Sequence, residues 1–267
     1  MERSVIKILF IGDIVGRPGR AAVKEFLPGI ISEEGIDFTI ANGENLAAGS
    51  GMTFETYNEI RQAGVDLFTS GNHIWKNKDI IEYLDDKNVM ILRPENYPED
   101  VPGHGREILE KLGKKILVCN LQGRVFMKED LTDPFAMAKE IAEKNKDIPI
   151  LIDFHAEATS EKVAFGRYLD GSVSIIIGTH THIQTTDEVI LPKGTGYITD
   201  IGMTGPVDSI LGVEKDIIIK KFLTQMPGSH KVASGETIFN AIVIDIDPEK
   251  KICLGLKKIS KLYSPTE

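Results

Sequence analysis

The chain has 267 residues, with 31 lysines and arginines against 40 aspartates and glutamates, so its formal net charge at pH 7 is −9. A chain of this length can bury a substantial core. The acidic balance argues against a general nucleic-acid-binding protein, because neutralising phosphates requires a basic face. No stretch approaches the roughly 18 uninterrupted apolar residues of a membrane helix, so we expect no membrane-spanning segment.

The cysteines and the N-terminus indicate a reducing compartment. The two cysteines, Cys119 and Cys253, lie inside apolar runs, which argues against a secreted disulfide framework. The first residues lead directly into a strand-like segment, without the apolar core and cleavage site of a signal peptide. We therefore expect a cytoplasmic protein.

The N-terminal third alternates short apolar runs with amphipathic segments. The run at residues 5–11 predicts a strand buried on both faces. Apolar residues at helical spacing then predict a helix that has Pro18 in its first turn and stops at Gly35. Further strands are predicted at 37–41, 65–70 and 89–92, and further helices at 54–63 and 78–86. This alternation predicts a largely parallel sheet with helices on its faces.

The rest of the chain mixes helices with hairpins. Hairpins are predicted at 107–121 and 238–260, helices at 134–144, 161–169 and 213–223, and strands at 148–154, 173–177, 187–191 and 196–199. No repeat or linker-like run interrupts the chain, so we expect residues 1–267 to form one domain. The α/β pattern suggests two packed sheets with helices outside.

Metal-ligand and acid/base residue types follow five of the predicted strands. In open α/β sheets, ligand groups collect at the carboxyl ends of strands. One such residue at a strand end is common by chance, whereas five clusters at equivalent positions indicate a site. The clusters contain Asp13; Asn42, Glu44 and Asn45; Asn72 and His73; His155; and His180 with His182.

The mixture of carboxylate, carboxamide and imidazole suits a borderline or hard divalent ion such as manganese, iron or zinc. The lack of cysteine in these clusters disfavours a structural zinc site. One glutamate can bridge two cations, and two ions about 3.5–4 Å apart can clamp a phosphoryl group and generate a hydroxide for in-line attack.

Each residue alone also has a structural interpretation. Asp13 could cap the following helix, the asparagines beside glycines could be turn residues, and His155 could be a hydrogen-bonded core histidine. The pair His180 and His182 is harder to explain by packing. His104 and His230 lie in turn contexts and are interpreted as surface residues, and Arg17 and Arg20 as solvated arginines.

These segments resemble the calcineurin-like metallophosphoesterase superfamily, whose blocks are D-x-H, GD, GNH, a lone histidine and GHxH. They are more closely similar to the YmdB-like phosphodiesterases of bacteria. The similarity extends from about residue 8 to about residue 212 and is carried by IGDIVGRPGR, ANGENLAAGSGMT, SGNHIW, DFHAEATSEK, GTHTHIQT and TDIGMTGP.

The resemblance implies a four-layer αββα sandwich of two mixed sheets and two divalent metal ions, iron first or manganese, and the donor types leave zinc as a further alternative. It implies that Glu44 bridges the ions and that His73 protonates the leaving oxygen. Asp13, Asn45 and His182 would complete one metal site; Asn72, His155 and His180 would complete the other. It also implies 2′,3′-cyclic or 3′,5′-cyclic nucleotides as substrates, and self-association.

The chain departs from the wider superfamily at two positions. Val15 stands where the D-x-H block has a histidine, and Glu44 replaces the bridging aspartate. Both changes fit the YmdB-like subgroup, in which the residue corresponding to Asn45 takes the place of the missing histidine ligand. The first metal therefore has one imidazole fewer than in many relatives.

The predicted function is a dinuclear metallophosphodiesterase that cleaves cyclic nucleotides or similar small phosphodiesters by attack of a metal-held hydroxide. A regulatory protein that senses a nucleotide with weak catalysis is an alternative from another class. A phosphomonoesterase or RNA-processing enzyme on the same scaffold is a third possibility. The acidic balance weakens the RNA version, and the metal ions rather than lysines would attract the anionic substrate.

Overall fold

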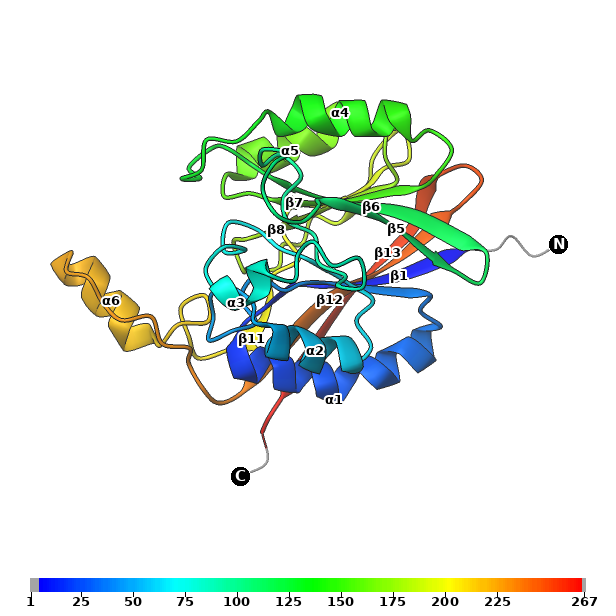
Figure 1. The fold of residues 1–267 in the computed structure, drawn as a ribbon. Coiled ribbons are helices and arrows are strands. Elements are labelled where there is room, and N and C mark those ends of the chain that lie inside the picture. The colour runs from blue at the N-terminus through cyan, green and yellow to red at the C-terminus, as the bar shows by residue number, and fades with distance from the viewer. Residues whose placement is uncertain (1–4, 266–267) are drawn as a thin grey trace.

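The computed structural model describes residues 5–265, so the expectation of no signal peptide falls in part on residues 1–4, outside the described residues. Two sheets pack face to face in the middle of the molecule (Figure 1). The helices α4 (Pro134–Lys144) and α5 (Thr159–Tyr168) cover one sheet, and α1 (Gly16–Glu34) and α2 (Phe54–Gln62) cover the other. The predicted four-layer αββα sandwich of two mixed sheets is confirmed.

The first sheet has β1 (Ile6–Ile11) near its centre. This strand runs parallel to β3 (Phe38–Asn42) and antiparallel to β12 (Thr237–Asp247). Beyond β3 lies β4 (Leu67–Thr69), and β12 also pairs with β11 (Met203–Pro206) and β13 (Ile252–Tyr263). The two-residue strand β2 (Asp13–Ile14) pairs with β11.

The second sheet has a parallel centre and antiparallel edges. Its strand order is β5 (Arg106–Lys111), β6 (Lys114–Gln122), β7 (Ile150–His155), β8 (Ile175–Thr179), β10 (Gly196–Ile198) and β9 (Val189–Ile190). The pairs β6–β7, β7–β8 and β8–β10 are parallel. Their carboxyl ends therefore lie at one edge of the sheet.

Local sequence signals set the ends of the covering helices. Gly35 ends α1 with φ 65°, a left-handed conformation that glycine adopts without steric cost. Thr53 and Thr56 form a capping box at the start of α2, and Asp133 caps α4 ahead of Pro134. Two further helices, α3 (Lys78–Ile81) and α6 (Lys215–Thr224), lie outside these layers, and α6 extends away from the body (Figure 1).

One hydrophobic core lies between the two sheets. Alternate residues of β1, such as Ile8 and Phe10, are fully buried there against Ile177 and Ile244 from other strands. Removing each such side chain from water stabilises the fold by about 1.5–3 kcal/mol. This rigid core positions the strand ends that carry the polar residues.

Two predicted elements are wrong in part. Residues 89–92 make only isolated bridges, Phe68 to Ile91 and Leu92 to His104, so their apolarity reflects burial rather than a strand. The helix predicted at 78–86 ends at Ile81 and continues as turns. There the carboxylate of Asp86 accepts a hydrogen bond from the backbone N–H of Asn88, which competes with helical bonding.

The short strands β2 and β11 were not predicted, because two to four residues give no usable periodicity. Among residues 5–265, no helix has both the length and the apolarity that crossing a membrane requires.

Candidate metal centre

The carboxyl ends of strands from both sheets meet at one place in the molecule. Asp13 follows β1, Glu44 follows β3, and His155 ends β7. The structure brings all eight predicted site residues into one connected cluster there, namely Asp13, Glu44, Asn45, Asn72, His73, His155, His180 and His182. The strands hold the backbone, and the loops after them carry the side chains.

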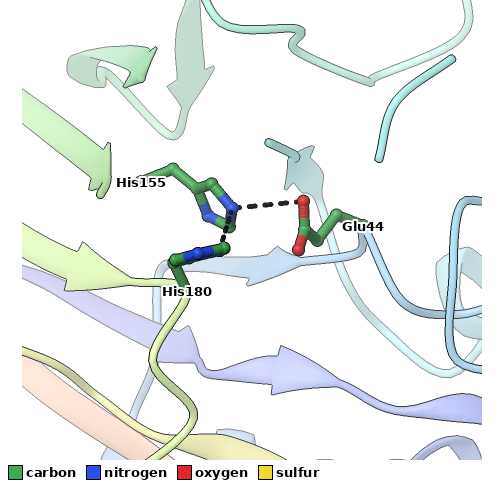
Figure 2. A group of neighbouring side chains, drawn as sticks. All are labelled: Glu44, His155 and His180. Carbon is green, nitrogen blue, oxygen red and sulfur yellow. Dashed lines mark hydrogen bonds and ion pairs between the residues drawn. The ribbon is translucent and has the colours of Figure 1, made fainter. Parts of the chain in front are cut away.

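One group of potential ligands consists of Glu44, His155 and His180 (Figure 2). His155 Nε2 lies 3.2 Å from Glu44 Oε2 and 3.1 Å from His180 Nδ1. The amide oxygen of Asn72 lies 3.2 Å from the same His155 nitrogen. These four side chains point their donor atoms toward one another, as ligands of a single cation would.

A second group consists of Asp13, Glu44 and His182. His182 Nε2 lies 3.8 Å from Asp13 Oδ1. The side chain of Asn45 lies beside this group: its amide nitrogen is 3.2 Å from both His182 Nε2 and Glu44 Oε1, and its amide oxygen, the atom that can bind a cation, faces His73. The two groups share Glu44 and no other residue, so they can accommodate two cations bridged by one carboxylate.

The chemistry of these groups fits divalent cations. Asp13 is completely buried, and its Oδ1 has no hydrogen-bond partner. Burial raises the pKa of Asp13 well above its usual value of 3.8. Leaving a buried carboxylate oxygen unpaired is costly unless a cation or proton compensates it. Oδ1 of Asp13 faces Nε2 of His182, and a metal ion bound there would supply the partner that this oxygen lacks.

The histidines of the first group differ in charge state when no metal is present. Burial disfavours the charged form of His155, but the adjacent Glu44 carboxylate raises its pKa to about 9. Burial and the nearby His155 lower the pKa of His180 to about 3. These pKa values favour a protonated His155 beside a neutral His180, and a metal ion that binds Nε2 of His155 would displace its proton.

Gly71 leaves the space that the first group occupies. A Cβ atom at this position would lie 2.2 Å from Nε2 of His155 and 2.5 Å from Oε2 of Glu44. Any side chain here would push these two ligands apart. The glycine after β4 is thus required by the close approach of the ligand side chains.

His73 lies beside both groups without belonging to either. Its Nδ1 is 2.8 Å from Asn45 Oδ1 and 3.4 Å from Glu44 Oε1, and its backbone N–H donates to Glu44 Oε2. Burial lowers the pKa of His73 below 6.5, an effect that the Glu44 carboxylate opposes. The other ring nitrogen, Nε2, has no hydrogen bond within residues 5–265, and the side chain is 27% exposed.

Three contacts outside the ligand groups fix the orientation of the imidazoles. Thr179 Oγ1 donates to Asp153 Oδ1 at 2.7 Å, so it accepts a hydrogen bond from Nδ1 of His155 at 2.8 Å. His182 Nδ1 donates to the carbonyl oxygen of Leu211 at 3.0 Å. Both histidines therefore present Nε2 to the centre, the arrangement by which outer contacts tune metal ligands.

Glu157 is a site residue that the sequence did not reveal. Its Oε2 lies 2.9 Å from Nε2 of His180, which directs Nδ1 of that ring toward the centre. Its position two residues after His155 was the available signal. Asp153 and Thr179 were also missed, because polar residues inside β7 and β8 look like ordinary strand residues.

The other polar residues considered from the sequence lie outside both ligand groups. His230 is exposed and His104 is partly exposed, in keeping with their interpretation as surface residues. Arg17 is exposed, as expected. The interpretation of Arg20 as solvated is wrong: its guanidinium contacts Glu59 and the carbonyl oxygen of Leu46, each at 2.5 Å. It thereby connects α1 and α2 to the loop that carries Glu44.

Comparison with a known protein gives this arrangement a family context. The chain is 50% identical over 256 residues to the 2′,3′-cyclic-nucleotide 2′-phosphodiesterase of Bacillus subtilis (strain 168), covering 95% of this chain and 96% of that protein.

Two solved structures share the fold over nearly the whole length. A hypothetical protein from Thermus thermophilus has a TM-score of 0.91 and 41% identity, covering 97% of this chain and 100% of that one. A phosphatase from Mycoplasma pneumoniae has a TM-score of 0.92 and 33% identity, covering 98% and 95%. These relatives confirm the prediction of a hydrolytic phosphoesterase. Because the sequence model described as "YmdB-like protein" also matches residues 9–259, the chain belongs to the YmdB-like protein family.

Proposed function

We propose that this protein is a phosphodiesterase that uses two divalent metal ions to hydrolyse cyclic nucleotides or similar small phosphodiesters. The observation that carries the proposal is the pair of ligand groups that share Glu44. The relative from Bacillus subtilis, named as a 2′,3′-cyclic-nucleotide 2′-phosphodiesterase, supports 2′,3′-cyclic nucleotides as the first substrates to test. Cyclic 3′,5′-nucleotides are the second class.

In this proposal, Asp13, Asn45 and His182 would hold one ion, and Glu44 would be a ligand of both ions. The second ion would be held by Asn72, His155 and His180. Divalent ions bound there would polarise a phosphoryl oxygen and make a bound water acidic. The donor set of imidazole nitrogens and carboxylate and amide oxygens suits iron, which we propose first, and also manganese or zinc.

His73 is proposed as the proton donor to the leaving oxygen. Its Nδ1 is occupied by Asn45, which fixes the ring, while Nε2 is free to exchange a proton with the substrate. The usual pKa of an imidazole lies near neutral pH, and the Glu44 carboxylate opposes the lowering of the His73 pKa by burial, which favours the protonated ring that a proton donor needs. Its position next to Glu44 places it beside both ligand groups, where the phosphodiester would lie.

Two bound metal ions would also account for the attraction of an anionic substrate to an acidic chain. Two divalent cations carry four positive charges, which the carboxylates of Asp13 and Glu44 offset only in part. A net charge of −9 on the chain as a whole therefore does not prevent phosphate binding at this point. A basic substrate-binding surface is not required.

A substrate panel tests the proposal. Protein loaded with Fe²⁺ or Mn²⁺ should hydrolyse bis-p-nitrophenyl phosphate and 2′,3′-cyclic AMP, and p-nitrophenyl phosphate more slowly. Glu44→Ala should lose metal and activity together, because Glu44 belongs to both groups. Failure of the metal-loaded protein on every diester would contradict the proposal, and preference for the monoester would favour a phosphomonoesterase.

Three expectations from the sequence stay predictions. These are the cytoplasmic location, self-association of the chain, and the organisation of residues 1–267 as one domain.

A further inference from the structure

A fully buried ion pair lies directly behind the loop that carries two of the candidate ligands. Lys162, on α5, and Asp200, after β10, are 1% and 0% exposed, and Lys162 Nζ lies 2.6 Å from Asp200 Oδ2. Neither residue belongs to the ligand groups described above. The proposed chemistry assigns no role to either residue.

The carboxylate of Asp200 accepts four hydrogen bonds. Besides Lys162, its Oδ2 accepts from the backbone N–H of Thr181 at 3.1 Å and from the hydroxyl of Thr181 at 2.7 Å. Its Oδ1 accepts from the backbone N–H of Gly202 at 2.8 Å. Thr181 is the residue between His180 and His182, so the carboxylate holds the middle of the ligand loop.

The ammonium group of Lys162 holds the start of the same loop. It donates to the carbonyl oxygen of Thr179 at 2.7 Å as well as to Asp200. Thr179 also contacts Nδ1 of His155 through its hydroxyl. The pair therefore holds the backbone on both sides of His180, at the carbonyl oxygen of Thr179 and at the N–H of Thr181.

The loop needs such support, because His180 and His182 have φ angles of 95° and 66°. Residues other than glycine rarely adopt positive φ, and they keep it only where the surrounding structure holds them. The Asp200 carboxylate is also linked to a third candidate ligand, Asp13, through Gly202. The N–H of Gly202 donates to Asp200, and its carbonyl oxygen accepts a hydrogen bond from the backbone N–H of Asp13 at 3.2 Å. One buried carboxylate thus connects the backbones of ligands in both groups.

We propose that the Lys162–Asp200 pair is a positioning element that sets the geometry of both metal sites by holding the loop from Thr179 to His182. This inference rests on the proposed metal centre. Stability alone does not explain the pair, because replacing buried ion pairs by apolar residues is often neutral or stabilising. A requirement to hold a strained ligand loop gives the pair a role that apolar packing cannot fill.

Calorimetric titration of metal-free protein with Mn²⁺ alone tests this inference, with thermal unfolding of the metal-free protein measured in parallel. Lys162→Met should weaken Mn²⁺ binding about 10–100-fold, the usual effect of removing an outer contact of a metal site. Thr181→Val removes one hydroxyl donor and leaves the ion pair intact, so it should still fold and bind Mn²⁺ about 10-fold more weakly.

Thr195→Val is the matched control. Thr195 is a buried threonine whose hydroxyl donates to the carbonyl oxygen of Val173 at 2.6 Å and accepts the N–H of Gly171 at 2.8 Å. It precedes β10, whereas Asp200 follows that strand. This variant should lower the unfolding temperature and leave the Mn²⁺ affinity unchanged.

Wild-type Mn²⁺ affinity in Thr181→Val would overturn the positioning role, as would an equal loss of affinity in Thr195→Val. If Lys162→Met does not fold, Thr181→Val against Thr195→Val still decides the question. A different result, no Mn²⁺ binding by the unaltered protein, would overturn the metal centre itself and this inference with it. The two failures are therefore distinguishable.

Discussion

The imidazole of His73 is fixed by Asn45, whose amide oxygen lies 2.8 Å from Nδ1 of the ring. Asn45 also contacts His182 and Glu44 through its amide nitrogen, so one carboxamide links the proposed acid to both a ligand and the proposed bridge. This link holds the proposed proton donor beside both ligand groups, outside the set of candidate ligands.

His73→Ala should therefore keep metal and lose turnover on substrates that need a proton. With 2′,3′-cyclic AMP the leaving group is a sugar oxygen, and kcat should fall about 10²–10⁴-fold, the usual contribution of a general acid. With bis-p-nitrophenyl phosphate the leaving anion is stable, so the loss should be much smaller. Parallel kinetics and metal analysis check this, and equal losses on both substrates would contradict the assignment.

Gly71→Ala should weaken metal binding by displacing two ligands. The new Cβ would lie 2.2 Å from Nε2 of His155 and 2.5 Å from Oε2 of Glu44, distances that only a shift of these side chains can relieve. We expect at least a 10-fold weaker affinity for Mn²⁺, measured by titration, as for other disturbances around metal ligands.

Gly29→Ala is the control for this substitution. Gly29 lies inside α1, where a Cβ would meet only Glu33 Oε1 at 3.9 Å. Alanine favours a helix interior over glycine by about 1 kcal/mol, so this variant should be slightly more stable and bind metal normally. Normal metal binding by Gly71→Ala would contradict the close approach of His155 and Glu44 to this glycine.

Asp13→Asn should stabilise the metal-free protein while weakening metal binding. The wild-type carboxylate is completely buried with an unpaired Oδ1, and burial raises its pKa. A neutral amide avoids most of this cost, about 1–3 kcal/mol. Denaturant unfolding without metal measures the gain, with Asp100→Asn as an exposed control. A lower free energy of unfolding for metal-free Asp13→Asn than for the wild type would argue against an unpaired Asp13 carboxylate that needs a metal ion.

The predictability of the fold differed between its parts. The strand β1 follows from its continuous apolar run, and the helices α1 and α4 follow from the spacing of their apolar residues, with Gly35 marking the end of α1. The segment at 89–92 could not be assigned correctly, because burial gives it the same apolar composition as a strand. A pattern of apolar residues indicates reliably which residues are buried, but it indicates only indirectly which segments pair as strands.

The site was predictable where its residues follow strands directly. The positions of Glu44, His155 and His180 after strand-like runs indicated that they meet. Lys162 and Asp200 could not be found in this way, because one lies on a helix and the other contacts the site only from behind. Such partners depend on tertiary packing, which the sequence pattern does not encode locally.

The ion pair of Glu59 should stabilise the protein only above acidic pH. Burial raises the pKa of Glu59, but hydrogen bonds from Lys24 and Arg20 outweigh this and lower it below 4.5. A lowered carboxylate pKa means that the stabilisation is present above pH 4.5 and is lost as the pH falls through the pKa of the folded state.

Glu59→Gln should therefore lower the free energy of unfolding by about 1 kcal/mol at pH 7 and much less at pH 3. Denaturant titrations at the two pH values measure the difference. Glu25→Gln, which changes an exposed glutamate of α1, should have little effect at either pH. A deficit in Glu59→Gln that stays constant with pH would contradict the ion-pair explanation.

The number of metal ions bound per chain tests the central proposal most directly. Titration of metal-free protein with Mn²⁺ should reach two equivalents, because Glu44 joins two ligand groups. His182→Ala, which removes a ligand from only one group, should bind one equivalent tightly, and Glu44→Ala should bind neither tightly. A single equivalent in the unaltered protein, or two in Glu44→Ala, would contradict a centre bridged by Glu44.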